Sequence, residues 1–209
     1  MSKVLVLGAT GATGKALIKE LRKTKLDVYA LARKPKPADF TGKWIEQQEM
    51  LPVPDIKPDH IMCCLGITRQ LAGSAENFRK IDHELVVNIA KELYKQNPNA
   101  TFSYVSSVGA NANSWFLYPN SKGLTENDLI SIGFKRCWIL RPGYLVYDEK
   151  RERGEQFLEA ILSFLVRFIP FKDTVSIPVT KVAQALIKLS ISLPEKVIYE
   201  HSEIHKLVK

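Results

Sequence analysis

The chain has 209 residues, of which 45% are hydrophobic and 25% charged, and its formal net charge is +8. These ordinary proportions exclude a disordered, collagen-like or coiled-coil chain, and the length predicts one domain, residues 1–209, with a core that needs no disulfide or metal. The Lys and Arg residues are dispersed and accompany no motif that reads a nucleic-acid groove, so we expect no specific nucleic-acid partner.

Alternating apolar runs and turn residues predict strands and helices in succession. We expect strands at residues 4–7, 27–31, 43–48, 61–65, 101–105, 137–140 and 197–200. Apolar patterning predicts helices at residues 16–21, 76–95, 122–131, 155–168 and 180–190. Strands that alternate with helices pair in parallel and are covered on both faces. The predicted fold class is therefore α/β: a doubly wound, Rossmann-like parallel sheet in a single domain, with a small C-terminal helical region on the substrate side.

The cysteines and the apolar segments bear on location. Cys63, Cys64 and Cys137 form neither a disulfide framework nor a metal-binding spacing, so we expect reduced thiols and no metal site. Residues 1–3 lead directly into an apolar run, and we expect no signal peptide. The apolar segment 157–171 is shorter than the ~20 residues of a membrane span, and we expect it to pack on its own domain. The sequence therefore predicts a cytoplasmic protein without a membrane span.

A glycine-rich turn, Gly8-Ala9-Thr10-Gly11-Ala12-Thr13-Gly14, directly follows the first predicted strand. Between a buried strand and a helix, such a turn is typical of dinucleotide binding. The first glycine permits the tight turn, the second lets the backbone approach a pyrophosphate, and the third lets the helix pack against the strand. The negative phosphates then face the helix N-terminus. An ordinary glycine-rich turn is the alternative.

Arg33 and Lys34 follow the second predicted strand. In a dinucleotide-binding fold a basic residue here accommodates the 2′-phosphate of NADP, whereas an acidic residue binds the ribose of NAD. Asp39 comes too late in the sequence to take the acidic role. The pair therefore favours NADP, and a solvated Arg-Lys pair is the alternative.

Tyr118 and Lys122 have the spacing that places two side chains on one face of a helix. A free tyrosine hydroxyl has a pKa of about 10, which a nearby ammonium and an oxidised nicotinamide would lower toward a value useful for proton transfer. Ser106 and Ser107 end the fifth predicted strand, at the edge where ligands bind in open α/β sheets, and either hydroxyl could bind a substrate carbonyl. An ordinary helix start and a strand-end turn are the alternatives.

Together, the glycine turn, the Ser-Ser strand end, Tyr-x-x-x-Lys and Arg141-Pro142-Gly143 resemble an atypical short-chain dehydrogenase/reductase, a member of the NAD(P)-binding Rossmann-fold proteins. Finer features, among them Cys63-Cys64-Leu65-Gly66 and Ser176-Ile177-Pro178-Val179, are similar to its Tat-interacting-protein oxidoreductase branch, which includes a fungal mitochondrial outer-membrane group. The resemblance covers essentially the whole chain. It departs from classical members in having Cys-Cys-Leu-Gly where they have Asn-Asn-Ala-Gly.

The resemblance implies NADP(H) as the cofactor and assigns residues to it. The cofactor-binding residues would be Gly8, Thr10, Gly11, Ala12, Thr13 and Gly14 at the pyrophosphate, Arg33 and Lys34 at the 2′-phosphate, Leu65 and Gly66 along the cofactor, and Leu145 and Arg153 at later contacts. Tyr118 would be the proton donor or acceptor, and Lys122 would bind the nicotinamide ribose and tune Tyr118. Ser106 or Ser107 would face the substrate.

The predicted function is that of an NADP(H)-dependent oxidoreductase of the short-chain dehydrogenase type. It would transfer a hydride between the nicotinamide and the carbonyl or alcohol carbon of a small molecule. The alternative is an NADPH-binding regulatory or interaction protein, a redox sensor with little turnover, since binding and catalysis share most of these residues. The presence of Ser, Tyr and Lys together favours the enzyme. The identity of the substrate and the oligomeric state have no signature in the sequence.

Overall fold

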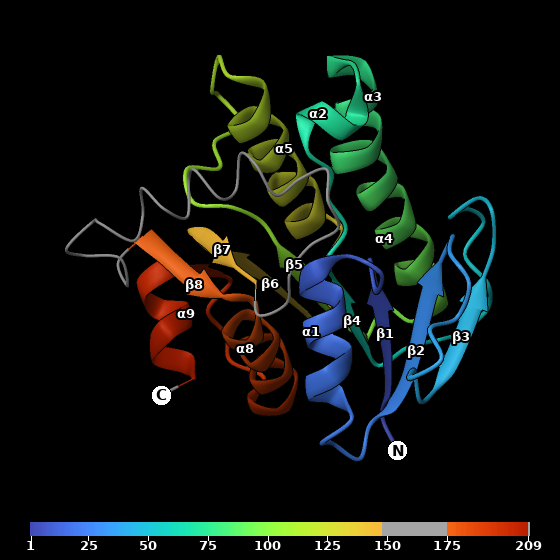
Figure 1. Cartoon of the computed structure of the whole chain (residues 1–209). Helices are drawn as coiled ribbons and strands as arrows, with labels where there is room; N and C mark the ends of the chain where they lie inside the picture. Colours follow the sequence, from blue (N-terminus) through green and yellow to red (C-terminus); the bar gives the residue numbers. More distant parts are fainter. Residues whose placement is uncertain (148–174, 209) are drawn as a thin grey trace.

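A parallel sheet forms the centre of the computed structural model, which describes residues 1–147 and 175–208 (Figure 1). In the described chain the sheet has seven strands in the order β3-β2-β1-β4-β5-β6-β9, each pair parallel. The strands are β1 (Lys3–Leu7), β2 (Asp27–Ala32), β3 (Lys43–Glu46), β4 (His60–Cys63), β5 (Thr101–Val105), β6 (Arg136–Arg141) and β9 (Ile198–Glu200). Strand order reverses between β1 and β4, the doubly wound arrangement, so the predicted α/β class is confirmed.

Helices cover both faces of the sheet, as Figure 1 shows. On one face lie α1 (Ala12–Leu21), α8 (Val179–Ser192) and α9 (His201–Leu207); on the other lie α4 (Leu85–Gln96) and α5 (Leu117–Ser131). Successive residues of β1 divide between the two cores: Val4 and Val6 pack with α1 and α8, whereas Leu5 and Leu7 pack with α4. This alternation explains why the strand is apolar throughout, since both of its faces are buried.

Several element boundaries differ from the predictions. The helix expected at residues 16–21 begins at Ala12, and the one expected at 122–131 begins at Leu117. The helix expected at 76–95 is divided into α3 (Ala75–Arg79), a π-helical turn (Lys80–Glu84) and α4, and is preceded by the short α2 (Arg69–Ala72). The predicted strands 43–48 and 61–65 both end two residues earlier than expected.

The sequence did not predict the two-stranded parallel sheet of β7 (Tyr144–Val146) and β8 (Ser176–Pro178), or the helix α9. Strands of three residues are too short to show an alternating pattern. The helix expected at 155–168 and the apolar segment 157–171 lie outside the described residues. Within residues 1–147 and 175–208, no helix combines the length and apolar character needed to cross a membrane.

Candidate functional site

The turn between β1 and α1 has the geometry that its glycines predict. Gly8 has a φ of +79°, a conformation that favours glycine, and its carbonyl accepts a hydrogen bond from the Gly11 amide at 3.0 Å. A Cβ on Gly14 would lie 2.1 Å from the Gly8 oxygen, so α1 packs directly on the turn. Gly11 is exposed, and the nearest atom to a Cβ there is 3.4 Å away. Gly8 and Gly14 are therefore required by the fold, while Gly11 leaves the backbone open to a ligand.

The N-terminus of α1 fits an anion. Gly11 caps this helix without a side-chain hydrogen bond, and the first turn contains no acidic residue. The first amides of a helix have no partners within it, and together with the helix dipole they attract negative charge. Thr10 and Ala12 are half-buried and Thr13 is buried at this end. The residues present thus fit the pyrophosphate that the family resemblance assigns to them.

Arg33 and Lys34 immediately follow the end of β2, and both are exposed. Neither side chain makes a hydrogen bond or ion pair with another of the described residues. The Asp39 carboxylate is instead bound by Arg22, just beyond the end of α1, at 2.7 Å, and this hydrogen bond holds the pKa of Asp39 below its ordinary value. The Arg33 guanidinium is therefore free of a carboxylate of the described chain and can bind an anion.

The segment after β4 touches both the glycine turn and α5. A Cβ on Gly8 would lie 2.7 Å from the carbonyl carbon and oxygen of Cys64. Leu65 is half-buried and Gly66 is exposed, and a Cβ on Gly66 would lie 3.5 Å from the Nζ atom of Lys122. The segment after β4 thus contacts the glycine turn at Cys64 and approaches Lys122 of α5 at Gly66.

Tyr118 and Lys122 both lie in α5, one helical turn apart, because this helix begins at Leu117. Tyr118 is 46% exposed, and its ring packs against Phe78 with the ring centroids 6.0 Å apart. Lys122 is buried and interacts electrostatically with Tyr118. An accessible hydroxyl beside a buried ammonium can exchange a proton with a ligand bound at this edge of the sheet.

Two buried side chains hold Lys122. Its Nζ atom donates a hydrogen bond to the Tyr104 hydroxyl at 2.8 Å and lies 3.0 Å from Oδ1 of Asp82. Burial opposes the charge on Lys122, but the Tyr104 hydroxyl and the Asp82 carboxylate outweigh this effect and hold the pKa of the ammonium above its ordinary value. Burial likewise raises the pKa of the Tyr104 hydroxyl. At neutral pH, Lys122 is therefore charged and Tyr104 is not.

The two serines at the end of β5 have different surroundings. Ser106 is buried and donates a hydrogen bond to Glu126 of α5 at 2.5 Å. Glu126 also binds Arg141 at the end of β6 through two nitrogens, and these hydrogen bonds raise the pKa of Arg141. Ser107 is half-buried, and within the described chain its hydroxyl makes a single long hydrogen bond, 3.3 Å, to the carbonyl of the adjacent Val108. The Ser106 hydroxyl is engaged by Glu126, so the Ser107 hydroxyl is the more available of the two to a ligand.

Of the two later predicted cofactor residues, the structure describes Leu145. Leu145 is in β7, where it is paired with Ile177 of β8 and packs against the core on the α1 and α8 face. Arg153 lies outside the described residues.

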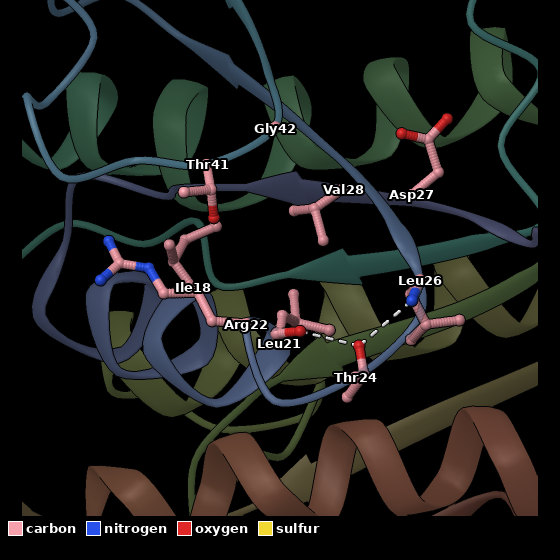
Figure 2. Close-up of a pocket in the computed structure, with 9 residues that line it drawn as sticks. All are labelled: Ile18, Leu21, Arg22, Thr24, Leu26, Asp27, Val28, Thr41 and Gly42. Carbon is pink, nitrogen blue, oxygen red and sulfur yellow. Dashed lines mark hydrogen bonds between the residues drawn. The ribbon is translucent and has the colours of Figure 1, made fainter.

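A surface pocket at the opposite end of α1 contains none of the predicted site residues (Figure 2). It is lined by Ile18, Leu21, Arg22, Thr24, Leu26, Asp27, Val28, Thr41 and Gly42. Within it, Thr24 donates a hydrogen bond to the Leu21 carbonyl at 2.7 Å and accepts one from the Leu26 amide at 3.3 Å, which stabilises the turn into β2. The pocket lies where β2 begins, and the candidate site lies where the strands end.

Residues 4–120 match the model of the NAD dependent epimerase/dehydratase family. The chain belongs to this family. Among curated relatives, the FMP52 protein of Candida albicans is 36% identical over 162 residues, covering 71% of this chain and 69% of the relative. The FMP52 protein of Eremothecium gossypii is 34% identical over 218 aligned positions, covering 98% of this chain and 96% of the relative. The expected NAD(P)-binding Rossmann family is confirmed, and these relatives are named FMP52 rather than Tat-interacting protein.

Solved structures of the same fold include epimerases. The ADP-L-glycero-D-manno-heptose-6-epimerase of Helicobacter pylori has a TM-score of 0.70 at 16% identity, covering 96% of this chain and 76% of that one. The human epimerase family protein SDR39U1, solved with NADPH, has a TM-score of 0.66 at 16% identity, covering 95% of this chain and 73% of that one. At these identities the likeness establishes the fold.

The prediction of a cytoplasmic location is wrong. The curated relatives of Candida albicans, Scheffersomyces stipitis and Eremothecium gossypii are all named mitochondrial proteins. The prediction rested on reduced cysteines and on the residues that precede β1. Unpaired thiols report the redox environment of a protein and do not identify its compartment.

Sequence reasoning missed three buried polar residues of the site, Asp82, Tyr104 and Glu126. Asp82 had a detectable signal, because it falls four residues after Phe78 and three before Leu85, on the apolar face of the predicted helix. A carboxylate on such a face indicates a buried partner. Tyr104 has the pattern of an ordinary core aromatic and Glu126 that of a solvated helix residue, so neither could be found from the sequence.

Proposed function

We propose that this protein is an NADP(H)-dependent oxidoreductase of the short-chain dehydrogenase type. A hydride passes between the nicotinamide and the carbonyl or alcohol carbon of a small molecule, and the Tyr118 hydroxyl gives or takes the proton. The observation that carries the proposal is the approach of Lys122 to Gly66. It brings the candidate catalytic helix α5 next to the segment after β4, which is proposed to lie along the cofactor. Membership of an NAD-dependent family supports the same chemistry.

The residues proposed to bind NADP(H) follow the carboxyl ends of three strands. The glycine turn after β1 and the N-terminus of α1 hold the pyrophosphate, and Leu65 and Gly66 after β4 lie along the cofactor. The exposed guanidinium of Arg33 and the ammonium of Lys34 bind the 2′-phosphate, whose charge and acceptor oxygens suit a planar, bidentate donor. The resemblance to the Tat-interacting-protein branch and the names of the mitochondrial relatives support an NADP-linked protein that acts at mitochondria.

Reduction of carbonyl compounds tests the function directly. NADPH oxidation is measured with a panel of aldehydes, ketones and quinones, using the wild-type protein and the Tyr118→Phe variant, which loses only a hydroxyl. Turnover is expected to fall by roughly 10²–10⁴-fold in the variant, because general acid–base steps contribute that much, while NADPH affinity stays unchanged. Tyr94→Phe, which removes a hydroxyl from a half-buried tyrosine of α4, is the matched control.

Two results would contradict this proposal. Turnover equal to that of the wild type in Tyr118→Phe would contradict the proposed role of Tyr118 in proton transfer. No activity on the whole panel, combined with tight NADPH binding, would replace the enzyme with a cofactor-binding regulatory protein.

Ser107 is proposed as the hydroxyl that faces the substrate. The Ser106 hydroxyl already donates a hydrogen bond to the buried Glu126, and a second acceptor would have to compete with this short hydrogen bond. Ser107→Ala is therefore expected to reduce turnover by on the order of 10-fold or more, since it removes a donor from the substrate carbonyl. Ser106→Ala is expected to lower the free energy of unfolding by about 1–3 kcal/mol, because Glu126 loses a buried partner. Steady-state kinetics and urea denaturation of both variants distinguish the two roles, and the reverse pattern would assign the substrate to Ser106.

A further inference from the structure

Asp82 is a fully buried carboxylate at the back of the candidate site. It lies in the π-helical turn between α3 and α4, and its Oδ1 atom is 3.0 Å from Lys122 Nζ. Neither carboxylate oxygen accepts a hydrogen bond of ordinary geometry from the residues that the structure describes. An uncompensated buried carboxylate is strongly unfavourable, so the Lys122 ammonium is the group that keeps Asp82 in place.

Two buried groups that face Lys122, Cys63 and Tyr104, are uncharged at neutral pH. Cys63 of β4, Tyr104 of β5 and Tyr118 of α5 interact with it electrostatically. Burial raises the pKa of the Cys63 thiol to about 12 and also raises that of the Tyr104 hydroxyl, which keeps both groups protonated. Among the described residues, Asp82 is therefore the anion that offsets the positive charge of Lys122.

Three neighbouring elements fix the position of the Asp82–Lys122 pair. The Asp82 carbonyl accepts a hydrogen bond from the Thr125 hydroxyl of α5 at 3.2 Å. A Cβ on Gly66 would lie 3.3 Å from Oδ1 of Asp82, so the segment after β4 rests directly on the pair. Tyr104 accepts a hydrogen bond from the ammonium, and Asp82 lies within ion-pair distance of it.

The π-helical turn places the carboxylate at this point. Such turns are rare and occur mostly where one residue is inserted into an α-helix, frequently at functional sites. Here the turn spans Lys80–Glu84, and Asp82 lies at its centre. The interruption of the helix thus coincides with the residue that reaches Lys122.

We propose that Asp82 is a positioning residue that holds Lys122 and compensates its charge. A nearly neutral Asp82–Lys122 pair, and not Lys122 alone, then determines how readily the Tyr118 hydroxyl loses its proton. Removing the carboxylate would leave an uncompensated cation beside Tyr118 and stabilise its phenolate. The catalytic meaning of this effect rests on the proposed function, because it concerns Tyr118. The electrostatic effect itself exists in the protein without cofactor or substrate.

Tyrosine titration measures the effect without any turnover. The full chain is labelled at the tyrosine ¹³Cζ position, and the Tyr118 resonance is assigned by its loss in Tyr118→Phe. In Asp82→Asn the midpoint of the Tyr118 titration is expected to fall by on the order of one pH unit, as uncompensated neighbouring charges produce such shifts. Asp128→Asn is the matched control, since it removes a carboxylate from α5 that pairs with His83 and not with Lys122. An unchanged midpoint in folded Asp82→Asn would overturn the proposal.

A double variant keeps the proposal testable if Asp82→Asn does not fold. Asp82→Asn combined with Lys122→Met removes both charges together, and replacing a buried ion pair with neutral residues is often tolerated. Its Tyr118 midpoint is expected to stay within about half a pH unit of the wild type, because the pair acts as a neutral unit. A rise of a full unit or more would show that Lys122 acts uncompensated and would refute the role of Asp82. If the carbonyl panel shows no turnover, the proposed function fails, whereas this titration still decides the role of Asp82.

Discussion

Nucleotide preference gives the most direct test of the cofactor site. Arg33 is exposed at the end of β2 and makes no ion pair with the described residues, and the nearby Asp39 carboxylate is occupied by Arg22. The 2′-phosphate of NADPH carries close to two negative charges, whereas NADH has a hydroxyl at the same position. We therefore expect wild-type protein to bind NADPH more tightly, and Arg33→Ala to lose most of this preference while NADH affinity stays nearly unchanged.

The expected difference in affinity between NADPH and NADH follows from the exposure of Arg33. Hydrogen bonds to charged groups contribute about 1.5–3 kcal/mol, and a guanidinium in open solvent is expected near the lower end of this range. Since about 1.4 kcal/mol corresponds to a tenfold change in affinity, NADPH should bind at least tenfold more tightly than NADH. Isothermal titration calorimetry of both nucleotides with both proteins measures the four dissociation constants.

Lys36→Ala provides the matched control. Lys36 is another exposed cation of the same loop, and its ammonium lies 5.9 Å from the ring centroid of Phe40. Its removal lowers the net charge by the same amount, so a general electrostatic effect would appear equally in both variants. Equal affinities of the wild type for the two nucleotides, or an undiminished preference in Arg33→Ala, would refute the role of Arg33.

Two further predictions concern the framework of the site. Gly14→Ala is expected to reduce both thermal stability and NADPH binding, because its Cβ would lie 2.1 Å from the Gly8 oxygen. Differential scanning calorimetry and calorimetric titration measure the two effects, and an unchanged melting temperature would contradict the prediction. Arg141→Met is expected to lower the free energy of unfolding by about 3 kcal/mol, since Glu126 then remains buried without its main partner. Urea denaturation measures this change. Lys80→Met, which breaks the exposed pair with Glu76, is the control and should cause no measurable loss of unfolding free energy.

The sequence predicted the strands of the sheet and most of the longer helices from their apolar patterns. Six of the predicted strands have continuous apolar or alternating runs, and their helices have apolar faces at helical spacing. The start of α5 was placed five residues late, because its first turn contains Pro119 and Asn120 and lacks an apolar face. Proline is compatible with the first turn of a helix, since its missing amide has no partner there.

The candidate site was predictable where backbone geometry determines residue type. Gly8 and Gly14 stand at positions where a Cβ would clash, so their spacing, together with the strand that precedes them, predicted the turn. The partners of Lys122 and Ser106 were not predictable, because they come from a π-helical turn and from a helix face that the sequence pattern represents as solvated. The pairing of buried polar side chains depends on which elements pack together in the fold, so it leaves no periodic signal in the sequence.

The position of α5 depends on polar contacts as well as on apolar packing. Leu129 is the large apolar side chain that α5 buries, whereas Lys122 and Glu126 on the same helix are buried and charged. Lys122 pairs with Asp82 on one neighbouring element and Glu126 pairs with Arg141 on another, so ion pairs in two directions hold the helix. Buried ion pairs contribute little net stability compared with apolar residues of similar size, but their geometry is specific. These ion pairs fix the helix, and the packing of the Tyr118 ring against Phe78 places the tyrosine at the edge where the strands of the sheet end.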